Sequence, residues 1–111
     1  MAGYSRFLAG KLALVTGGSG TIGQAIAKSL LSSGASVVLT ARRLEKLEAV
    51  QETLQKESGT GQVHIITSDV SKEQSVIELF EKIDALDAGK GLDLLVNNAG
   101  ECPSKYSRGV A

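Results

Sequence analysis

The chain has 111 residues, and its 12 Lys and Arg residues balance its 12 Asp and Glu residues. A neutral chain of this length suits one domain of ordinary size, and its bulk charge gives no reason to expect a nucleic acid partner. The first residues hold no long apolar run, so we expect no signal peptide and no membrane partner. Cys102 is the only cysteine, which excludes an intramolecular disulfide and fits a reducing, cytoplasmic location.

Four short apolar runs, bounded by turn residues, predict strands. They cover residues 12–16, 36–40, 62–67 and 92–96. Helical repeats separate them, so the elements alternate as β-α-β-α-β-α-β. Such alternation predicts an α/β fold with a parallel sheet and right-handed crossovers.

Three helices are predicted between these strands, each with one apolar face. The first ends at Gly34, because a glycine can take the left-handed conformation common at helix ends. The third begins at a capping box formed by Ser71 and Gln74. The apolar faces, in chain order, are Ile22, Ile26 and Leu30; Leu44, Leu47, Val50 and Leu54; and Val76, Ile77, Phe80 and Ile83.

Glycines crowd the loop between the first strand and the first helix, where Gly18, Gly20 and Gly23 read G-x-G-x-x-G. The N–H groups at the start of a helix lack intrahelical partners and carry partial positive charge, which suits a phosphate. The spacing assigns one glycine to a tight turn, Gly20 to close approach of a pyrophosphate, and Gly23 to packing of the helix on the strand. A glycine-rich turn without a ligand is the alternative, but the order of strand, loop and helix favours a dinucleotide site.

The residues after the second predicted strand favour NADP over NAD. An NAD site usually places Asp or Glu there, to accept hydrogen bonds from the ribose. Ala41 stands at about that position and cannot accept one, and Arg42 and Arg43 follow. A guanidinium group can bind a 2′-phosphate through two hydrogen bonds, and Arg42 is the better candidate. The alternative is that both arginines are solvated at the start of the next helix.

Four stretches in this order, TGGSGTIG, TARR, DV and NNAG, resemble the short-chain dehydrogenase/reductase family over residues 11–100. The resemblance implies a Rossmann-like, three-layer α/β/α domain that binds NAD(P), which we place at residues 1–100. The chain would hold the cofactor-binding half of this fold, truncated after the fourth strand. Residues 101–111 have little apolar periodicity, and we expect a divergent or disordered tail there.

The resemblance also implies a role for each site residue. The pyrophosphate would lie against the glycine loop, with Ile22 near the nicotinamide and Arg42 at the 2′-phosphate. Asp69 would accept a hydrogen bond from the adenine amino group, and Val70 would line the ring. Asn97 would lie near the ribose and also tie the central strands together. The implied cofactor-binding residues are Gly17, Ser19, Gly20, Thr21, Ile22, Gly23, Arg42, Asp69, Val70, Asn97, Ala99 and Gly100.

The glycine spacing differs from that of the commonest, single-domain branch, T-G-x-x-x-G-x-G, because Thr21 stands where that branch has its middle glycine. The spacing of Gly17, Gly20 and Gly23 resembles the extended branch, T-G-x-x-G-x-x-G. NNAG and the arginine after the second strand favour the single-domain reductases. The Thr21 hydroxyl could donate to a phosphate or cap the helix.

Catalysis in this family resembles a proton relay beside a hydride transfer, with a tyrosine, a lysine four residues later and a serine. Tyr4 precedes the first strand, and Tyr106 has Val110 four residues on, so we assign no catalytic residue. The first hypothesis is an NADP-dependent oxidoreductase for a carbonyl or alcohol substrate, represented by its cofactor-binding half. The second is a catalytically inactive nucleotide-binding fragment or truncated variant. The third is an extended-type relative that acts on a nucleotide sugar.

Two further expectations concern metals and partners. His64 is the only histidine and no cysteine pair exists, so we expect no protein-bound catalytic metal. We expect His64 to be a packed or partly exposed strand residue. The fourth strand would present an apolar edge without a further strand beside it, so we expect marginal stability or self-association through that edge.

Overall fold

The computed structural model describes residues 8–58, 61–86 and 91–98. Strands and helices alternate there in the predicted order, and each strand boundary lies within two residues of the predicted one. The strands are β1 (Leu12–Thr16), β2 (Ser36–Ala41), β3 (Val63–Thr67) and β4 (Leu94–Val96), and the helices are α1 (Thr21–Ser32), α2 (Leu44–Ser58) and α3 (Glu73–Asp84). The predicted tail at 101–111, with Ala99 and Gly100, lies outside the described residues.

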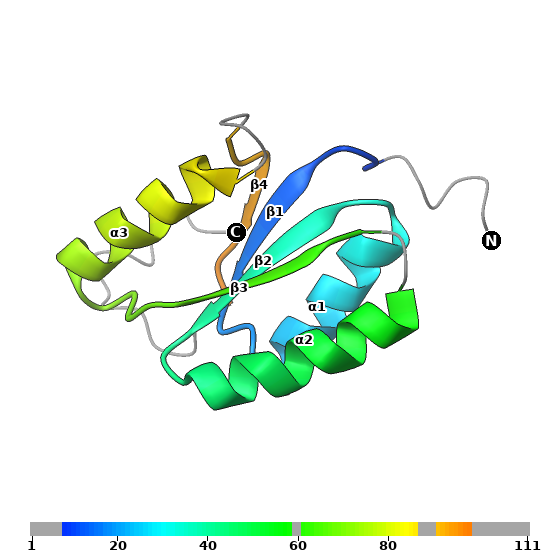
Figure 1. Cartoon of the computed structure of the whole chain (residues 1–111), viewed down its shortest axis with the longest axis horizontal. Helices are drawn as coiled ribbons and strands as arrows, with labels where there is room; N and C mark the ends of the chain where they lie inside the picture. Colours follow the sequence, from blue (N-terminus) through cyan, green and yellow to red (C-terminus); the bar gives the residue numbers. More distant parts are fainter. Residues whose placement is uncertain (1–7, 59–60, 87–90, 99–111) are drawn as a thin grey trace.

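The four strands form one parallel sheet in the order β3-β2-β1-β4. β1 lies inside the sheet, with Leu14 paired to Val38 of β2 on one side and to Leu95 of β4 on the other. The chain therefore leaves β1 toward β2 and β3, and later returns to the other side of β1 for β4 (Figure 1). Sheets of this kind bind ligands at the carboxyl ends of the strands, where the strand order reverses.

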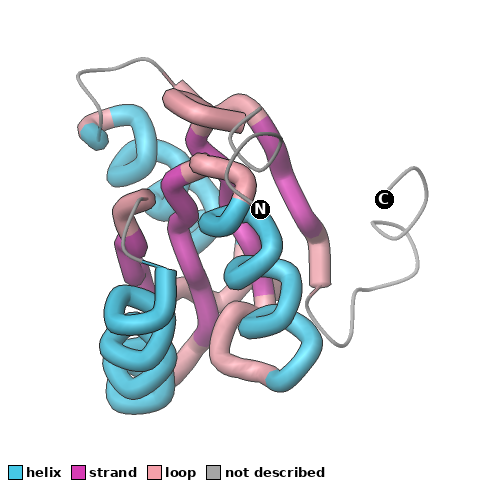
Figure 2. Tube along the Cα trace, turned by 90° about the vertical axis from the view of Figure 1, so that its right-hand side faces the viewer, coloured by secondary structure: helices cyan, strands magenta, loops and turns pink. Residues whose placement is uncertain are grey.

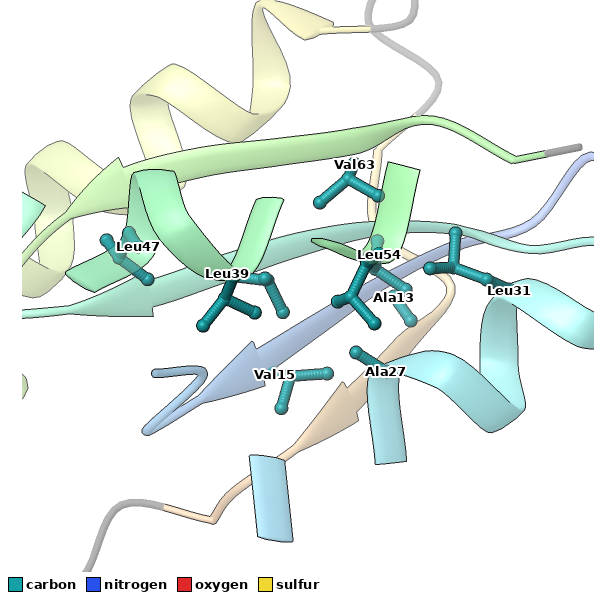
Figure 3. Packing of buried hydrophobic residues seen from close by; sticks show 10 residues of the cluster. Ala13, Val15, Ala27, Leu31, Leu39, Leu47, Leu54 and Val63 are labelled. Carbon is teal, nitrogen blue, oxygen red and sulfur yellow. The ribbon is translucent and has the colours of Figure 1, made fainter. Parts of the chain in front are cut away.

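Helices cover both faces of the sheet, which confirms the three-layer arrangement (Figure 1). α1 and α2 pack side by side on one face, as the view in Figure 2 also shows, and α3 covers the other face. In the larger buried cluster, Leu31 of α1 and Leu47 and Leu54 of α2 gather over Leu39 and Val63 of the sheet (Figure 3). Every residue of β1 is buried, as predicted for a strand covered on both faces.

The buried face of α1 is turned by one residue from the predicted stripe. Gly23, Ala27 and Leu31 are the buried residues of this helix, whereas Ile22 is 66% exposed. The two other members of the predicted stripe are only partly buried. The reason is steric, because a helix comes closest to its neighbours where its side chains are smallest. The repeat of large apolar residues identified the helix but not the face that meets the sheet.

α1 ends as predicted at Gly34, whose φ angle is +96°. The N–H group of Gly34 donates to the Leu31 carbonyl at 3.0 Å, and that of Ala35 donates to the Leu30 carbonyl at 3.1 Å. This pair of bonds is the Schellman motif, which satisfies carbonyl groups that the last helical turn leaves open.

The predicted capping box at the start of α3 is wrong. The N-cap residue is Lys72, and no side chain caps the helix. The Ser71 hydroxyl instead donates to Asp69 Oδ1 at 2.6 Å, and the side-chain amide of Gln74 donates to Glu78 Oε2 at 3.5 Å. The helix begins at Glu73, one residue later than a capping box at Ser71 requires, so Ser71 lies before the N-cap position.

Two other apolar faces differ from the prediction in detail. On α3 the buried residues are Leu79 and Ile83, and the prediction missed Leu79. Ile77, expected in the buried face, is 45% exposed, and Leu44 at the start of α2 is 48% exposed. The other predicted positions of both helices are buried or half-buried.

None of the helices in the described ranges combines the length and the apolar character that crossing a bilayer requires. His64 is half-buried on β3, which confirms the expectation for this residue. Across the part of the chain that the structure describes, no group of three or more His, Cys, Asp or Glu side chains could hold a metal ion.

Candidate functional site

The loop between β1 and α1 is held tightly against β2. Gly17 begins it with a φ angle of +63°, a left-handed conformation that favours glycine, so the tight turn is at Gly17 and not within the G-x-G-x-x-G triplet. The Gly18 N–H group donates to the Thr40 carbonyl at 3.0 Å. A Cβ atom on Gly18 would lie 2.8 Å from the Leu39 Cβ atom, so only glycine allows this contact.

Gly20 marks the point where α1 begins and space opens. It is the N-cap residue of α1, exposed and with an ordinary extended backbone. A Cβ atom built on it would have one neighbour within 4 Å, the Gly17 carbonyl oxygen at 3.6 Å. Thr21 is the first helical residue, so the expectation that it might cap the helix is wrong. The first turn of α1 has no acidic residue, and its N–H groups keep their partial positive charge facing this space.

Gly23 serves packing, but against different neighbours from those predicted. A Cβ atom on Gly23 would lie 2.4 Å from the Gly17 carbonyl oxygen and 3.1 Å from Asn98 Nδ2. The nearest atoms to this position therefore belong to the glycine loop and to the segment after β4.

The carboxyl ends of β1 and β4 are joined through Thr16. Its hydroxyl donates to Asn97 Oδ1 at 3.0 Å and accepts a hydrogen bond from the Asn98 N–H group at 2.8 Å. Asn97 thus ties the end of β4 to the end of β1, a strand-joining role that the family resemblance implied. Ala99 and Gly100, the next two predicted site residues, lie outside the described part of the chain.

A cleft of about 610 Å³ opens beside the glycine loop at the carboxyl ends of β2 and β3. It brings together five of the predicted site residues from three separate loops. These residues are Gly17, Ser19, Arg42, Asp69 and Val70. The remaining described ones, Gly20 to Gly23 and Asn97, lie at the start of α1 and the end of β4, outside the lining of this cleft.

Several lining residues were not predicted from the sequence. Lys46 lies in the first turn of α2, and its place beside Arg42 and Arg43 follows from the position of that helix. Thr40, Ser68 and Ser71 also line the cleft, and no sequence pattern distinguishes them from other hydroxyl residues.

The cleft is rich in positive charge. Arg42, Arg43 and Lys46 are exposed and line it together. Among the described residues, the salt bridges join Lys28 to Glu57 and Lys56 to Glu52, so none of the three cleft cations is paired. Three unpaired cations around one cleft suit an anionic ligand such as a phosphate.

Asp69 is oriented by the turn that follows β3. Its Oδ1 atom accepts hydrogen bonds from the Ser71 hydroxyl at 2.6 Å and from the Ser71 N–H group at 3.0 Å. The hydroxyl bond, followed by the N–H bond, holds the pKa of the Asp69 carboxyl below its ordinary value, and the positive charges of Lys72 and Arg42 add to the shift. The side chain is therefore ionised at neutral pH, and the hydrogen bonds from described residues leave Oδ2 available to a donor.

The chain is similar to known proteins over most of its length. The sequence model for the short chain dehydrogenase family matches residues 11–108. The chain belongs to this family. Farnesol dehydrogenase of Aedes aegypti is 44% identical over 92 residues, which cover 83% of this chain and 36% of that protein. This chain spans about a third of the length of the curated relatives it matches.

Solved structures of the family have the same architecture. L-Sorbose reductase from Gluconobacter frateurii, complexed with NADPH and L-sorbose, matches 89% of this chain and 36% of its own with a TM-score of 0.79 and 33% identity. The RhlG/NADP complex from Pseudomonas aeruginosa matches 93% of this chain and 40% of its own with a TM-score of 0.77 and 41% identity. These matches confirm the Rossmann-like fold predicted from the sequence.

Proposed function

We propose that this chain is the NADP(H)-binding part of an oxidoreductase that acts on a carbonyl or alcohol substrate. The observation that carries the proposal is the cleft, in which the glycine loop meets three exposed cations and one oriented carboxylate. L-Sorbose reductase and RhlG, which share this fold, were solved with NADPH and NADP. Bound NADP(H) would supply or accept the hydride in such a reaction.

The pyrophosphate would lie at the start of α1. The space over Gly20 admits it, because a Cβ atom there would project where almost no protein atom lies. Gly17, Ser19 and Thr21 would border the phosphates, and Gly23 would hold the helix close to the loop. Ile22 is exposed and would offer its apolar side chain toward the nicotinamide end. The residues proposed to contact the ribose and cofactor backbone are Asn97, Ala99 and Gly100.

The adenosine would occupy the cleft itself. Arg42 would bind the 2′-phosphate, with Arg43 and Lys46 adding positive charge beside it. Asp69 would accept a hydrogen bond from the adenine amino group through Oδ2, and Val70 would line the ring. No carboxylate stands at the end of β2, where it would repel a 2′-phosphate, because Ala41 occupies that position.

A titration of the 111-residue chain with NADPH and with NADH, followed by nucleotide fluorescence, tests this proposal. We expect NADPH to bind about 10 to 100 times more tightly, the factor that one charge-assisted hydrogen bond provides. Arg42→Ala should remove most of that difference and leave NADH affinity nearly unchanged, because NADH has no 2′-phosphate.

Lys28→Ala is the matched control for the loss of one positive charge. Lys28 is exposed and pairs with Glu57 at 3.5 Å, and neither residue lines the cleft. Its substitution should leave the preference intact. Equal affinities of the unsubstituted chain for NADPH and NADH, or an unchanged preference in Arg42→Ala, would remove the case for a 2′-phosphate contact.

A second candidate function is nucleotide binding without turnover. The observation in its favour is that neither Tyr4 nor Tyr106 has a lysine four residues later. On this proposal the chain binds NADPH but does not oxidise it when small aldehydes and ketones are added. Steady consumption of NADPH by the purified chain, measured by absorbance, would favour the oxidoreductase over this candidate.

A further inference from the structure

A pair of buried hydroxyl residues belongs to the wall of the cleft, where β2 and β3 end. Thr40 has no exposed surface and Ser68 is 8% exposed. The Thr40 hydroxyl donates to the Ile66 carbonyl at 2.6 Å, and Thr40 Oγ1 and Ser68 Oγ are hydrogen-bonded to each other. A hydroxyl has one hydrogen to donate, so the bond between the two side chains is donated by Ser68.

The backbone of Thr40 extends this connection to the glycine loop. Its carbonyl accepts the hydrogen bond from Gly18 at 3.0 Å, and the Ser68 N–H group donates to the Ala41 carbonyl at 3.0 Å. Thr40 belongs to the end of β2 and is hydrogen-bonded both to the glycine loop and to the end of β3. It therefore connects the three segments that form the cleft.

The side chains that would recognise adenosine follow this pair directly in the chain. Arg42 comes two residues after Thr40, and Asp69 comes immediately after Ser68. Both belong to short segments beyond the paired strand residues, so their separation depends on how the two strand ends are joined. Removing one hydroxyl would leave the other group buried without its partner, which favours a shift of one segment away from the other.

We propose that the Thr40–Ser68 hydroxyl pair is a positioning element for the adenosine end of the cofactor, holding Arg42 and Asp69 at the separation that a 2′-phosphorylated adenosine requires. The proposal rests on the proposed function. On this inference the two hydroxyl groups raise the affinity for the ligand in addition to any effect on stability. They would do so by holding Arg42 and Asp69 in place, and not by binding the ligand themselves.

The test compares Thr40→Val, which keeps the shape and loses the hydroxyl, with Thr40→Ser, which keeps the hydroxyl. The probe is 2′,5′-ADP, which carries the adenosine end alone, and its affinity is measured by calorimetry on the 111-residue chain. We expect Thr40→Val to bind it about tenfold more weakly and Thr40→Ser to bind it within about twofold of the unsubstituted chain.

Val63→Ala is the stability control, since Val63 is buried at the opposite end of β3. It should lower the melting temperature and leave 2′,5′-ADP affinity unchanged at temperatures where the variant is folded. If Thr40→Val does not fold, Ser68→Ala is the deciding variant. It keeps the hydrogen bond from Thr40 to Ile66 and removes only the bond between Thr40 and Ser68. Ser68→Ala should weaken 2′,5′-ADP binding severalfold.

The outcomes separate this inference from the proposed function. If the unsubstituted chain does not bind 2′,5′-ADP while folded, the proposed NADP site itself is wrong. If it binds, and both Thr40→Val and Ser68→Ala bind equally well, the hydroxyl pair has no positioning role. The inference is also overturned if Val63→Ala loses as much affinity as Thr40→Val, since the effect would then follow stability alone.

Discussion

Gly20 and Gly23 lie three residues apart and are required for different reasons. At Gly20 a side chain would meet open space and an extended backbone, so Gly20→Val should cost about 1 kcal/mol of stability or less. The same side chain would occupy the volume proposed for the pyrophosphate, so NADPH affinity should fall at least about tenfold. Thermal melting and nucleotide titration of the variant measure the two effects separately.

Gly23→Ala, in contrast, should lower the stability of the fold directly. Its Cβ atom would collide with the Gly17 carbonyl oxygen at 2.4 Å, so the free energy of unfolding should fall by about 1–3 kcal/mol. If Gly20→Val bound NADPH as tightly as the unsubstituted chain, the phosphate site at the start of α1 would have to be abandoned.

The ionisation of Asp69 depends on Ser71. Because the folded-state pKa of Asp69 is lowered, its ionised form contributes stability above the unfolded-state pKa of about 3.9, and this contribution is lost as the pH falls through the lower folded value. Ser71→Ala removes the hydroxyl bond, so the pKa of Asp69 should rise toward its ordinary value while the N–H bond keeps part of the shift. A carbon NMR titration of the carboxyl group measures this directly.

Gln74→Ala is the control for that titration, because the Gln74 side chain bonds to Glu78 and not to Asp69. It should leave the Asp69 titration unchanged. An Asp69 pKa that does not move in Ser71→Ala would contradict the assignment of the shift to this hydroxyl.

At the scale of the elements, α1 offers a clear test of which face is buried. Leu31 is fully buried, so Leu31→Ala should lower the free energy of unfolding by about 2–5 kcal/mol. Ile22 is 66% exposed, so Ile22→Ala should change it by no more than about 0.5 kcal/mol. Chemical denaturation of both variants provides the comparison, and similar losses in the two would restore the stripe predicted from the sequence.

The sequence predicted the order and type of the elements because each buried strand is a short apolar run bounded by turn residues. It did not predict the face of α1, because Gly23 and Ala27 add almost nothing to an apolar repeat and yet are buried. The start of α3 was missed by one residue, because the turn in which Asp69 accepts hydrogen bonds from Ser71 extends to Lys72, and the helix begins only at Glu73.

The candidate site was predictable where a motif assigns a residue to a strand end, as for Arg42 and Asp69, which the structure brings to one cleft. Lys46, Thr40 and Ser68 required the fold. Their place in the cleft follows from the pairing of β2 with β3 and from the direction in which α2 leaves the sheet, and neither is expressed in a local pattern.

At the scale of the whole molecule, β4 presents an apolar edge. β4 is the last strand of the described sheet on its side, and Leu94 and Leu95 are 41% and 47% exposed. We therefore predict that the chain self-associates, and that Leu95→Lys shifts it toward the monomer, because a charge on an edge strand opposes pairing. Sedimentation velocity over a range of concentrations measures this.

Ile77→Lys is the matched control for that experiment, since Ile77 is 45% exposed but lies on α3. It should leave the association unchanged. A chain that sediments as a monomer at all concentrations and melts sharply would show that the β4 edge does not drive association.

The position of β1 in the sheet also bears on how the protein forms during synthesis. Leu14 pairs with Val38 of the next strand in the chain, and with Leu95 of β4, which is synthesised only after β3 and α3. On the ribosome, β1, β2 and β3 can assemble with α1 and α2 long before β4 emerges, so one side of β1 stays open while translation continues. Closing that side requires a contact between distant parts of the chain, which is entropically costly and slow. Between the completion of β3 and the arrival of β4, the nascent chain therefore exposes one side of β1.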